Sequence, residues 1–237
     1  MVDAILVKGL RLGGEWIRSI EGPQPNPRPT DSFPWDAQLR SRWPEITAEW
    51  VAFRSVGGKL PRIEQVLEES QGNIGTWEAG LLMSGGRPCT LLAEQFPVTT
   101  AALSAVPGIR SALWSVLDAG AAIPDHVGPN PGVLRYHLGI DCPEGAAIRI
   151  GSATTAYRDG ATILLDDVVS HEAWNHGDRE RVTLFCDMLR PLPGPWYSVN
   201  AAAQRLLMLD RRYRMAPKRA DAWHIALNPM LTHPPVH

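Results

Sequence analysis

The sequence predicts a mainly β fold, a sandwich or barrel of the jelly-roll kind with flanking helices at both ends. From residue 109 onward, short runs rich in β-forming residues follow one another, among them "GVLRYHLGID", "ATILLDD" and "RVTLFCDML". Turn signals such as "GPNPG", "CPEG" and "NHGD" separate these runs. Many short strands at such close spacing are typical of antiparallel sheets that close around one core.

The part of the chain before these strands is expected to be extended at first and then helical. Residues 22–34 are dense in proline, which excludes a helix or a central strand and predicts an extended connector. Segment 35–56 places apolar residues at three- and four-residue intervals, with a helix start at Trp43-Pro44-Glu45 and an end near the following glycine pair. Segments 61–70 and 97–108 predict two further helices, the second ended by a Pro-Gly pair.

We expect a single domain over residues 1–237, with the β-core at about 106–192. Residues 1–105 form the helical and extended N-terminal part, and residues 193–237 a C-terminal helical tail, where "SVNAAAQRLLMLDRRYRM" has helical spacing. Within the core, Asp159-Gly160 lies between two strand-like runs and predicts a hairpin.

Composition narrows the class of protein. Hydrophobic residues make up 44% of the chain and charged residues 20%, as in globular proteins, and the net charge of −2 does not favour binding to a nucleic acid polymer. The three cysteines have no CxxC spacing, so we expect neither a disulfide framework nor a zinc ribbon, and a reducing cytoplasmic location. We also expect no signal peptide, and no apolar run reaches the ~18 residues of a membrane span.

Two histidines with matching surroundings carry the functional prediction. His126 is followed after nine residues by Arg135, and His171 after ten by Arg181, all within apolar, strand-like stretches. Neutral imidazole is the commonest protein ligand for first-row transition metals. An arginine that faces a barrel interior needs an anion, so a metal with interior arginines suits a dicarboxylic co-substrate. Strand parity alone leaves open that the arginines point outward.

The stretches "IPDHVGPNPGVLRYHLG" and "LLDDVVSHEAWN", with an arginine ten residues after the second histidine, resemble the aspartyl/asparaginyl β-hydroxylase family. That family comprises iron(II)- and 2-oxoglutarate-dependent oxygenases on a double-stranded β-helix. The resemblance covers residues 105–195 well, the N-terminal part weakly through "FPWDAQLRSRWPEITAEW", and the C-terminal tail not at all. It implies Fe(II), 2-oxoglutarate and O₂, and hydroxylation of an unactivated C–H bond.

The resemblance also implies a metal site. His126 and His171 match the iron ligands, and Gly128 stands where most non-haem oxygenases have a carboxylate, which leaves an open coordination position. Asp125 is out of register for the usual ligand set, while Asp167 and Trp174 match the family pattern.

The co-substrate site follows in the same way. Ser115, Arg135 and Arg181 match residues that bind 2-oxoglutarate, with Arg181 on its distal carboxylate. His137 matches a residue near the metal-bound carboxylate.

Three alternatives remain open at this point. His126, His137 and His171 together are a possible three-histidine metal site. The position at Gly128 is also suited to chloride, which would make the protein an iron(II)/2-oxoglutarate-dependent halogenase. A non-catalytic β-barrel that binds a small anion would keep the arginines and lack the metal.

The substrate is expected, by elimination, to be a small metabolite or a peptide-derived molecule. The basic segment near the C-terminus contains Arg211, Arg212 and Arg214, which we consider as contacts for a phosphate group on the substrate. A solvated helix face is the alternative interpretation of this charge run.

Overall fold

The computed structural model describes residues 13–67 and 72–232. The strands assigned there are β1 (Trp77–Ser84), β2 (Arg87–Pro88), β3 (Ile109–Leu117), β4 (Ala122–His126), β5 (Val133–Asp141), β6 (Ala146–Ile150), β7 (Ala153–Ala156), β8 (Thr162–Leu165), β9 (His171–Asn175) and β10 (Arg181–Leu189). They form a six-stranded sheet in the order β2-β1-β3-β10-β5-β8 and a four-stranded sheet in the order β4-β9-β6-β7. All the pairings are antiparallel.

The two sheets pack face to face around a shared apolar core. Leu117, Ile163 and Leu165 come from the six-stranded sheet, and Ile148 and Ala173 from the four-stranded sheet, and these buried side chains form one cluster. This arrangement confirms the predicted fold class, a double-stranded β-helix (jelly roll) with flanking helices.

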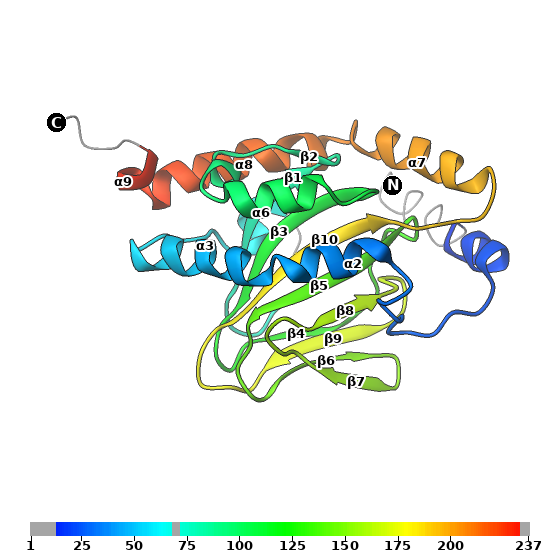
Figure 1. Ribbon diagram of the computed structural model, residues 1–237, viewed down its shortest axis with the longest axis horizontal. Helices are drawn as coiled ribbons and strands as arrows, with labels where there is room; N and C mark the ends of the chain where they lie inside the picture. Colours follow the sequence, from blue (N-terminus) through cyan, green and yellow to red (C-terminus); the bar gives the residue numbers. More distant parts are fainter. Residues whose placement is uncertain (1–12, 68–71, 233–237) are drawn as a thin grey trace.

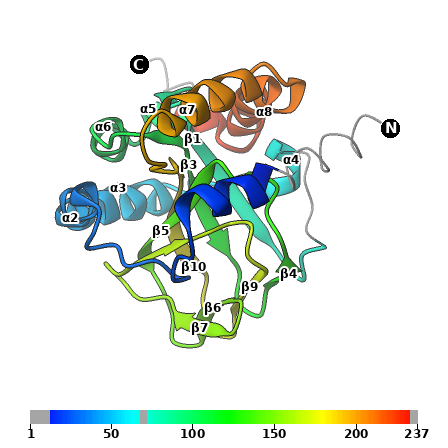
Figure 2. The ribbon, with the colours of Figure 1, turned by 90° about the vertical axis from the view of Figure 1, so that its right-hand side faces the viewer.

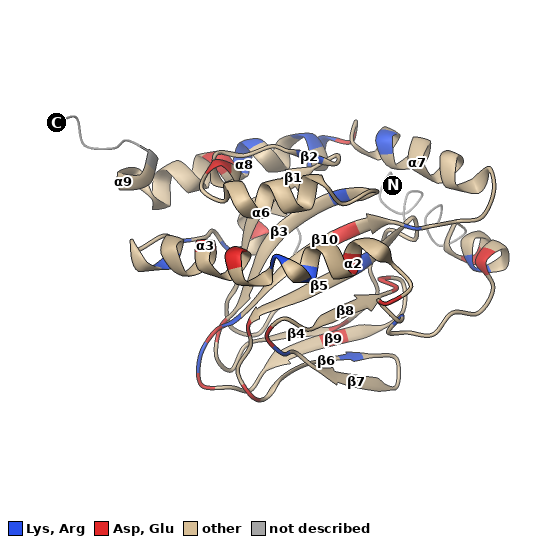
Figure 3. Ribbon diagram, viewed as in Figure 1, with Lys and Arg blue, Asp and Glu red and all other residues tan. Residues whose placement is uncertain are grey.

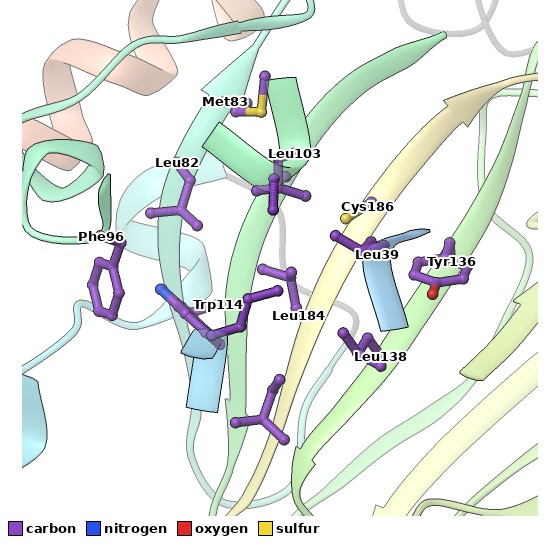
Figure 4. Packing of buried hydrophobic residues seen from close by; sticks show 14 of the residues in the cluster. Leu39, Leu82, Met83, Phe96, Leu103, Trp114, Tyr136, Leu138, Leu184 and Cys186 are labelled. Carbon is purple, nitrogen blue, oxygen red and sulfur yellow. The ribbon is translucent and has the colours of Figure 1, made fainter. Parts of the chain in front are cut away.

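Helices cover the outer face of the six-stranded sheet and its upper end. They are α2 (Pro34–Ser41), α3 (Trp43–Ser55), α4 (Ile63–Leu67), α5 (Leu91–Glu94), α6 (Pro97–Ser104), α7 (Trp196–Leu207), α8 (Arg211–Leu227) and α9 (Pro229–Thr232), preceded by a helical stretch at residues 13–21. α2, α3 and α6 lie across the large sheet (Figure 1). Figure 4 shows Leu39, Phe96 and Leu103 from the helical side packing against Trp114 and Leu184 of the sheet.

The helices expected before the β-core are confirmed. Segment 35–56 forms α2 and α3, and α3 starts at Trp43 because Pro44 fits the first turn of a helix, where its missing N–H is not needed. Segment 97–108 contains α6, and the described part of 61–70 contains α4. No helix in the described residues is both long enough and apolar enough to cross a lipid bilayer.

The sheet begins earlier in the chain than predicted. β1 pairs along most of its length with β3, so the β-core starts at residue 77 and not at about 106. Residues 81–83 of β1 form a continuous apolar run, "LLM". All three are buried, because both faces of this strand are covered. A strand buried on both faces has no period-two alternation, which is why periodicity did not identify it.

The hairpin predicted at Asp159-Gly160 is wrong. A turn does form there, with the Ala161 N–H donating to the Arg158 carbonyl and Gly160 at φ +67°. The flanking strands do not pair, however, because β7 pairs with β6 and β8 pairs with β5. The turn therefore carries the chain from one sheet to the other.

The predicted C-terminal helical tail is confirmed as α7, α8 and α9. Ala216 and Ala220 of α8 pack with Ile63 and Val66 of α4 onto the inner face of β1, β3 and β10. Figure 2 shows α7 and α8 at the end of the molecule opposite β6 and β7. The two helices thus close the end of the barrel that the small sheet leaves uncovered.

Candidate active site

Two histidine rings from neighbouring strands face each other. His126 ends β4, His171 begins β9, and the two residues are paired in the antiparallel register, with ring centroids 4.2 Å apart. Each Nδ1 atom lies 2.8 Å from a carbonyl oxygen, that of Pro124 for His126 and that of Val169 for His171. Because a carbonyl only accepts hydrogen bonds, Nδ1 carries the proton in both rings. Each Nε2 therefore keeps its lone pair for a metal ion.

Both rings are held in the neutral state. Burial lowers the pKa of His171 to about 4, and the neighbouring His126 ring contributes in the same direction. Burial also lowers the pKa of His126, and the positive charge of Arg135 adds to this shift. Neutral imidazole is the form that binds metal ions, so the pair is ready to do so at neutral pH.

A carboxylate occupies the space beside Gly128. The Gly128 N–H donates to the Asp167 carbonyl at 2.7 Å, and a β-carbon built on Gly128 would lie only 1.7 Å from Oδ2 of Asp167. Asp167 is fully buried, and its Oδ1 lies 3.6 Å from Nε2 of His171. A negative charge is thus supplied next to the histidine pair by Asp167 and not by the residue at position 128.

Arg135 binds the carboxylate of Asp167 and holds it in place. Its Nη1 forms an ion pair with Oδ1 of Asp167, and its Nε donates to Oδ1 of Asp187 at 3.2 Å. The guanidinium lies 4.5 Å above the centroid of the Phe185 ring. Arg135 therefore faces the interior, but two carboxylates already neutralise it.

Arg181 is the opposite case, a buried arginine with no carboxylate partner among the described residues. Its exposed fraction is 1%, its Nη2 donates to Oγ of Ser115 at 3.1 Å, and its Nε has no hydrogen-bond partner. The guanidinium lies 4.7 Å from the centroid of the Tyr157 ring. Ser115 also accepts a hydrogen bond from Nε1 of Trp77 at 2.9 Å. A buried cation of this kind requires an anion, and none of the described side chains supplies it.

Further unsatisfied polar atoms come from residues near Arg181. Oγ1 of Thr183 and Nε2 of His137 are both buried without a hydrogen-bond partner. Thr183 pairs with Ser115 across β10 and β3, so both side chains lie on the inner face of the sheet. Burial, followed by the charges of Arg181 and Arg135, holds the pKa of His137 well below its usual value. Together these side chains offer a cation, hydroxyl groups and a neutral imidazole to one polar molecule.

The three-histidine alternative finds no support within residues 13–67 and 72–232. No group of three histidine, cysteine, aspartate or glutamate side chains converges there as a metal-binding set. His137 is instead engaged with Tyr157, whose hydroxyl lies 2.9 Å from its Nδ1, and its ring packs against Phe185.

A pocket is lined by His126, by residues of the inner face of the large sheet and by residues of the C-terminal helices. Its lining includes residues of the site, namely His126, Gly128, Arg135, Asp167 and Asp187. It also includes many apolar side chains, and they are Ile63, Leu67, Leu81, Leu113, Val133, Phe185, Met208 and Ala216. The pocket therefore suits a substrate with a substantial apolar part.

Arg110 also lines this pocket, and it has no carboxylate partner among the described residues. Arg110 is half-buried, and its Nε is buried with no hydrogen-bond partner. Burial lowers the pKa of Arg110, and the positive charge of Arg205 lowers it further. Two guanidinium groups close together favour the binding of an anion.

The three arginines predicted to contact a phosphate are placed unequally. Arg212 lines the pocket, and it pairs with Asp210 at 3.2 Å. Arg211 and Arg214 are exposed on α8 and do not line the pocket. Trp174 is half-buried and stacks on His176, and Asp125 is exposed and pairs with Arg149.

Sequence comparison identifies the family of this chain. The family model of aspartyl/asparaginyl beta-hydroxylase matches residues 40–191, which is more than half of the chain. The chain belongs to the aspartyl/asparaginyl β-hydroxylase family. This confirms the resemblance seen in the sequence, and the match ends before α7 and α8 begin.

Relatives of this family member include enzymes of two kinds. The chain is 34% identical over 183 residues to the ornithine lipid ester-linked acyl 2-hydroxylase of Rhizobium tropici, covering 75% of this chain and 65% of that protein. It is 30% identical over 169 residues to the Homo sapiens aspartyl/asparaginyl beta-hydroxylase, covering 65% of this chain and 21% of that protein. The chain thus spans less than two thirds of the length of these relatives.

A solved structure also shows a partial likeness to this family member. It is a predicted oxalate decarboxylase of Thermotoga maritima, at 16% sequence identity and a TM-score of 0.40, covering 56% of this chain and 93% of that one.

Several residues around the candidate site of this hydroxylase-family chain were not predicted from the sequence. Trp77, Tyr157, Thr183 and Asp187 each contact a predicted site residue or lie beside one in the sheet. Thr183 and Asp187 are two and six residues beyond Arg181 on the same strand, so inward parity from Arg181 was a usable signal. No comparable signal marks Trp77 or Tyr157, which reach the site only through the pairing and crossing of strands.

Proposed function

We propose that this protein is an iron(II)- and 2-oxoglutarate-dependent hydroxylase. The observation that carries the proposal is Arg181, a fully buried guanidinium without a carboxylate partner among the described residues, in the same barrel as two imidazoles with free Nε2 atoms. A dicarboxylate with a metal-binding end satisfies both features at once. The hydroxylase names of the relatives support the same reaction class.

The proposed roles follow from the contacts of each side chain. His126 and His171 would hold Fe(II), with the Asp167 carboxylate beside them. Arg181 and Ser115 would bind the distal carboxylate of 2-oxoglutarate, and His137 would contribute its free Nε2. When bound, iron and 2-oxoglutarate supply the oxidising chemistry with O₂. The protein positions the substrate C–H bond and excludes water, and no side-chain acid or base is required at the carbon.

Arg135 receives a narrower role than the sequence resemblance implies. Its two carboxylate partners leave it little charge for 2-oxoglutarate, so we assign it chiefly to the orientation of Asp167.

Hydroxylation is favoured over halogenation by the position of Asp167. A halogenase needs room and a favourable potential for chloride beside the metal. Here the volume next to Gly128 is filled by a carboxylate, which repels an anion. We therefore propose that chloride does not enter this position.

The pocket narrows the substrate class. Its apolar lining side chains and the unpaired Arg110 suit a molecule with an apolar chain and an anionic group. The Rhizobium tropici relative is named for the hydroxylation of a lipid acyl chain, which has this character. Among small-molecule and peptide-derived substrates, we propose one that carries an acyl-like chain.

Anaerobic titration tests the proposal directly. The protein loaded with Fe(II) should develop a metal-to-ligand charge-transfer absorption on addition of 2-oxoglutarate. In air, it should release succinate, and acyl-chain substrates should raise that release. His126→Ala and His171→Ala should abolish both signals. Absence of metal uptake by the parent protein would instead favour a non-catalytic barrel that binds an anion.

A further inference from the structure

Helix α7 buries polar side chains and exposes apolar ones, which is the reverse of an ordinary surface helix. Its buried side chains are polar, with Asn200 and Gln204 each 5% exposed. Its outward side chains include Val199 and Leu206, which are 47% and 68% exposed. A helix on the surface of a globular protein normally places its apolar stripe toward the core.

The polar face of α7 is fastened to the loop before β5. Nδ2 of Asn200 donates to the Gly132 carbonyl at 2.8 Å. Gln204 and Asn130 exchange two side-chain hydrogen bonds, at 2.9 and 3.0 Å. These three hydrogen bonds orient the helix, because a buried amide is costly unless it is satisfied. The outward position of the apolar residues is therefore built into the structure.

The exposed apolar surface covers the start of α7 and extends beyond the helix. Trp196 and Tyr197, its first two residues, are 37% and 41% exposed, and Leu209, just after the helix, is 68% exposed. Trp16 is 41% exposed and contacts Trp196 edge-on, with ring centroids 4.8 Å apart. Exposed tryptophan and tyrosine beside aliphatic residues are characteristic of surfaces that enter the interface of a bilayer.

Cations flank this apolar surface. Arg205 of α7 and Arg211, Arg214 and Lys218 of α8 are exposed, and none forms an ion pair with a described residue. The acidic residues of the same segment are occupied, since Asp210 caps α8 and Asp221 accepts from the Leu91 N–H. Figure 3 shows basic positions on α7 and on the first half of α8 along the upper side of the molecule.

We propose that this surface, made by α7, Leu209, Trp16 and the basic first half of α8, docks onto a lipid bilayer that carries anionic headgroups. The apolar residues would enter the interface while the arginines and Lys218 meet the headgroups. A symmetric contact with a second copy of the chain would bring the same cations together, which disfavours it. Gln204, on the inward face of α7, lines the pocket, so the docking surface and the pocket lie on opposite faces of this helix.

Sedimentation with vesicles tests this proposal on the full chain. The protein should co-sediment with vesicles of phosphatidylcholine and phosphatidylglycerol, bind phosphatidylcholine alone more weakly, and dissociate as salt is added. Leu206→Glu/Leu209→Glu should weaken binding by at least about tenfold, because it places charge in the apolar surface. Arg211→Ala/Arg214→Ala should weaken binding only to the anionic vesicles.

A matched control is available on α3 and at the residue that caps it. Val51 and Val56 are 59% and 64% exposed, far from α7 in the fold, so Val51→Glu/Val56→Glu should bind vesicles like the parent. Failure of the parent to bind anionic vesicles would overturn the proposal. So would an equal loss in the control, or a dimer in light scattering that Leu206→Glu dissociates without vesicle binding. Succinate release is measured separately, so these outcomes leave the hydroxylase proposal standing.

Discussion

Gly128 and Asp167 share one volume beside the histidine pair, since a β-carbon at residue 128 would come within 1.7 Å of the Asp167 carboxylate. The absence of a side chain at residue 128 is therefore a steric requirement of the Asp167 position. Arg135 and the backbone of Gly128 hold that aspartate from two sides. Gly128 stands where a ligand carboxylate would be expected, and its missing side chain leaves room for the Asp167 carboxylate.

Replacing Gly128 should damage the metal site through Asp167. Gly128→Ala forces the Asp167 carboxylate to move, and we expect Fe(II) affinity to fall by about 10- to 100-fold, as for other groups that orient metal ligands. Metal titration measures the change. Gly14→Ala is the control, because its β-carbon would meet Pro131 at an ordinary 3.6 Å. Unchanged affinity in Gly128→Ala would show that Asp167 does not influence the metal.

Two fully buried arginines should respond in opposite ways to the same substitution. Arg181 has no carboxylate partner in the described residues, so Arg181→Met should weaken 2-oxoglutarate binding by at least about thirtyfold while leaving the melting temperature unchanged or higher.

Arg190 is 0% exposed and pairs with Glu21 and Asp166. Arg190→Met should lower the free energy of unfolding by about 3 kcal/mol, because it leaves Arg28 as the one remaining cation for two buried carboxylates. Calorimetry and co-substrate titration separate the two effects. A large fall in melting temperature for Arg181→Met would mean that Arg181 is structural.

The metal-free protein should lose stability in mild acid. The pKa of His171 is about 4 in the folded state and about 6.5 when unfolded, so the unfolded state binds the extra proton first. Above about pH 6.5 the neutral His171 ring makes its full contribution to the free energy of unfolding. That contribution, up to about 3 kcal/mol, is lost as the pH falls toward 4. His126 shifts in the same direction.

Chemical denaturation of the chelator-treated protein across that range measures this loss. The double variant His126→Gln/His171→Gln should show a much flatter pH dependence in the same window. An equally steep dependence in that variant would assign the acid sensitivity to other groups.

Arg110 should contribute to anion binding without stabilising the fold. It is half-buried beside the like charge of Arg205, so Arg110→Met should leave the melting temperature unchanged or raise it. Phosphate added at constant ionic strength should stabilise the parent protein more than this variant. Thermal scans test both statements. A lower melting temperature for Arg110→Met, with equal stabilisation by phosphate, would remove Arg110 from the proposed substrate site.

Spacing along the chain was sufficient for much of the site. His126 and His171 were predicted as a pair, and their rings do meet, because both lie at strand ends and strands of one sheet lie side by side. Arg181 was predicted to need an anion, and its position on β10 turns it inward. The phosphate role of Arg211 and Arg214 rested on charge alone, and these residues lie outside the pocket.

The sequence by itself determined the fold class, the flanking helices, the family and the residues of the histidine pair, because local periodicity and motif spacing carry that information. Only the tertiary structure decided that β1 belongs to the large sheet, that Asp159-Gly160 joins two sheets, and that Asp167 fills the space beside Gly128. It also decided the orientation of α7, whose polar residues face inward to bind the loop at 130–132. These features depend on contacts between residues far apart in the chain, and neither propensity nor periodicity encodes such contacts.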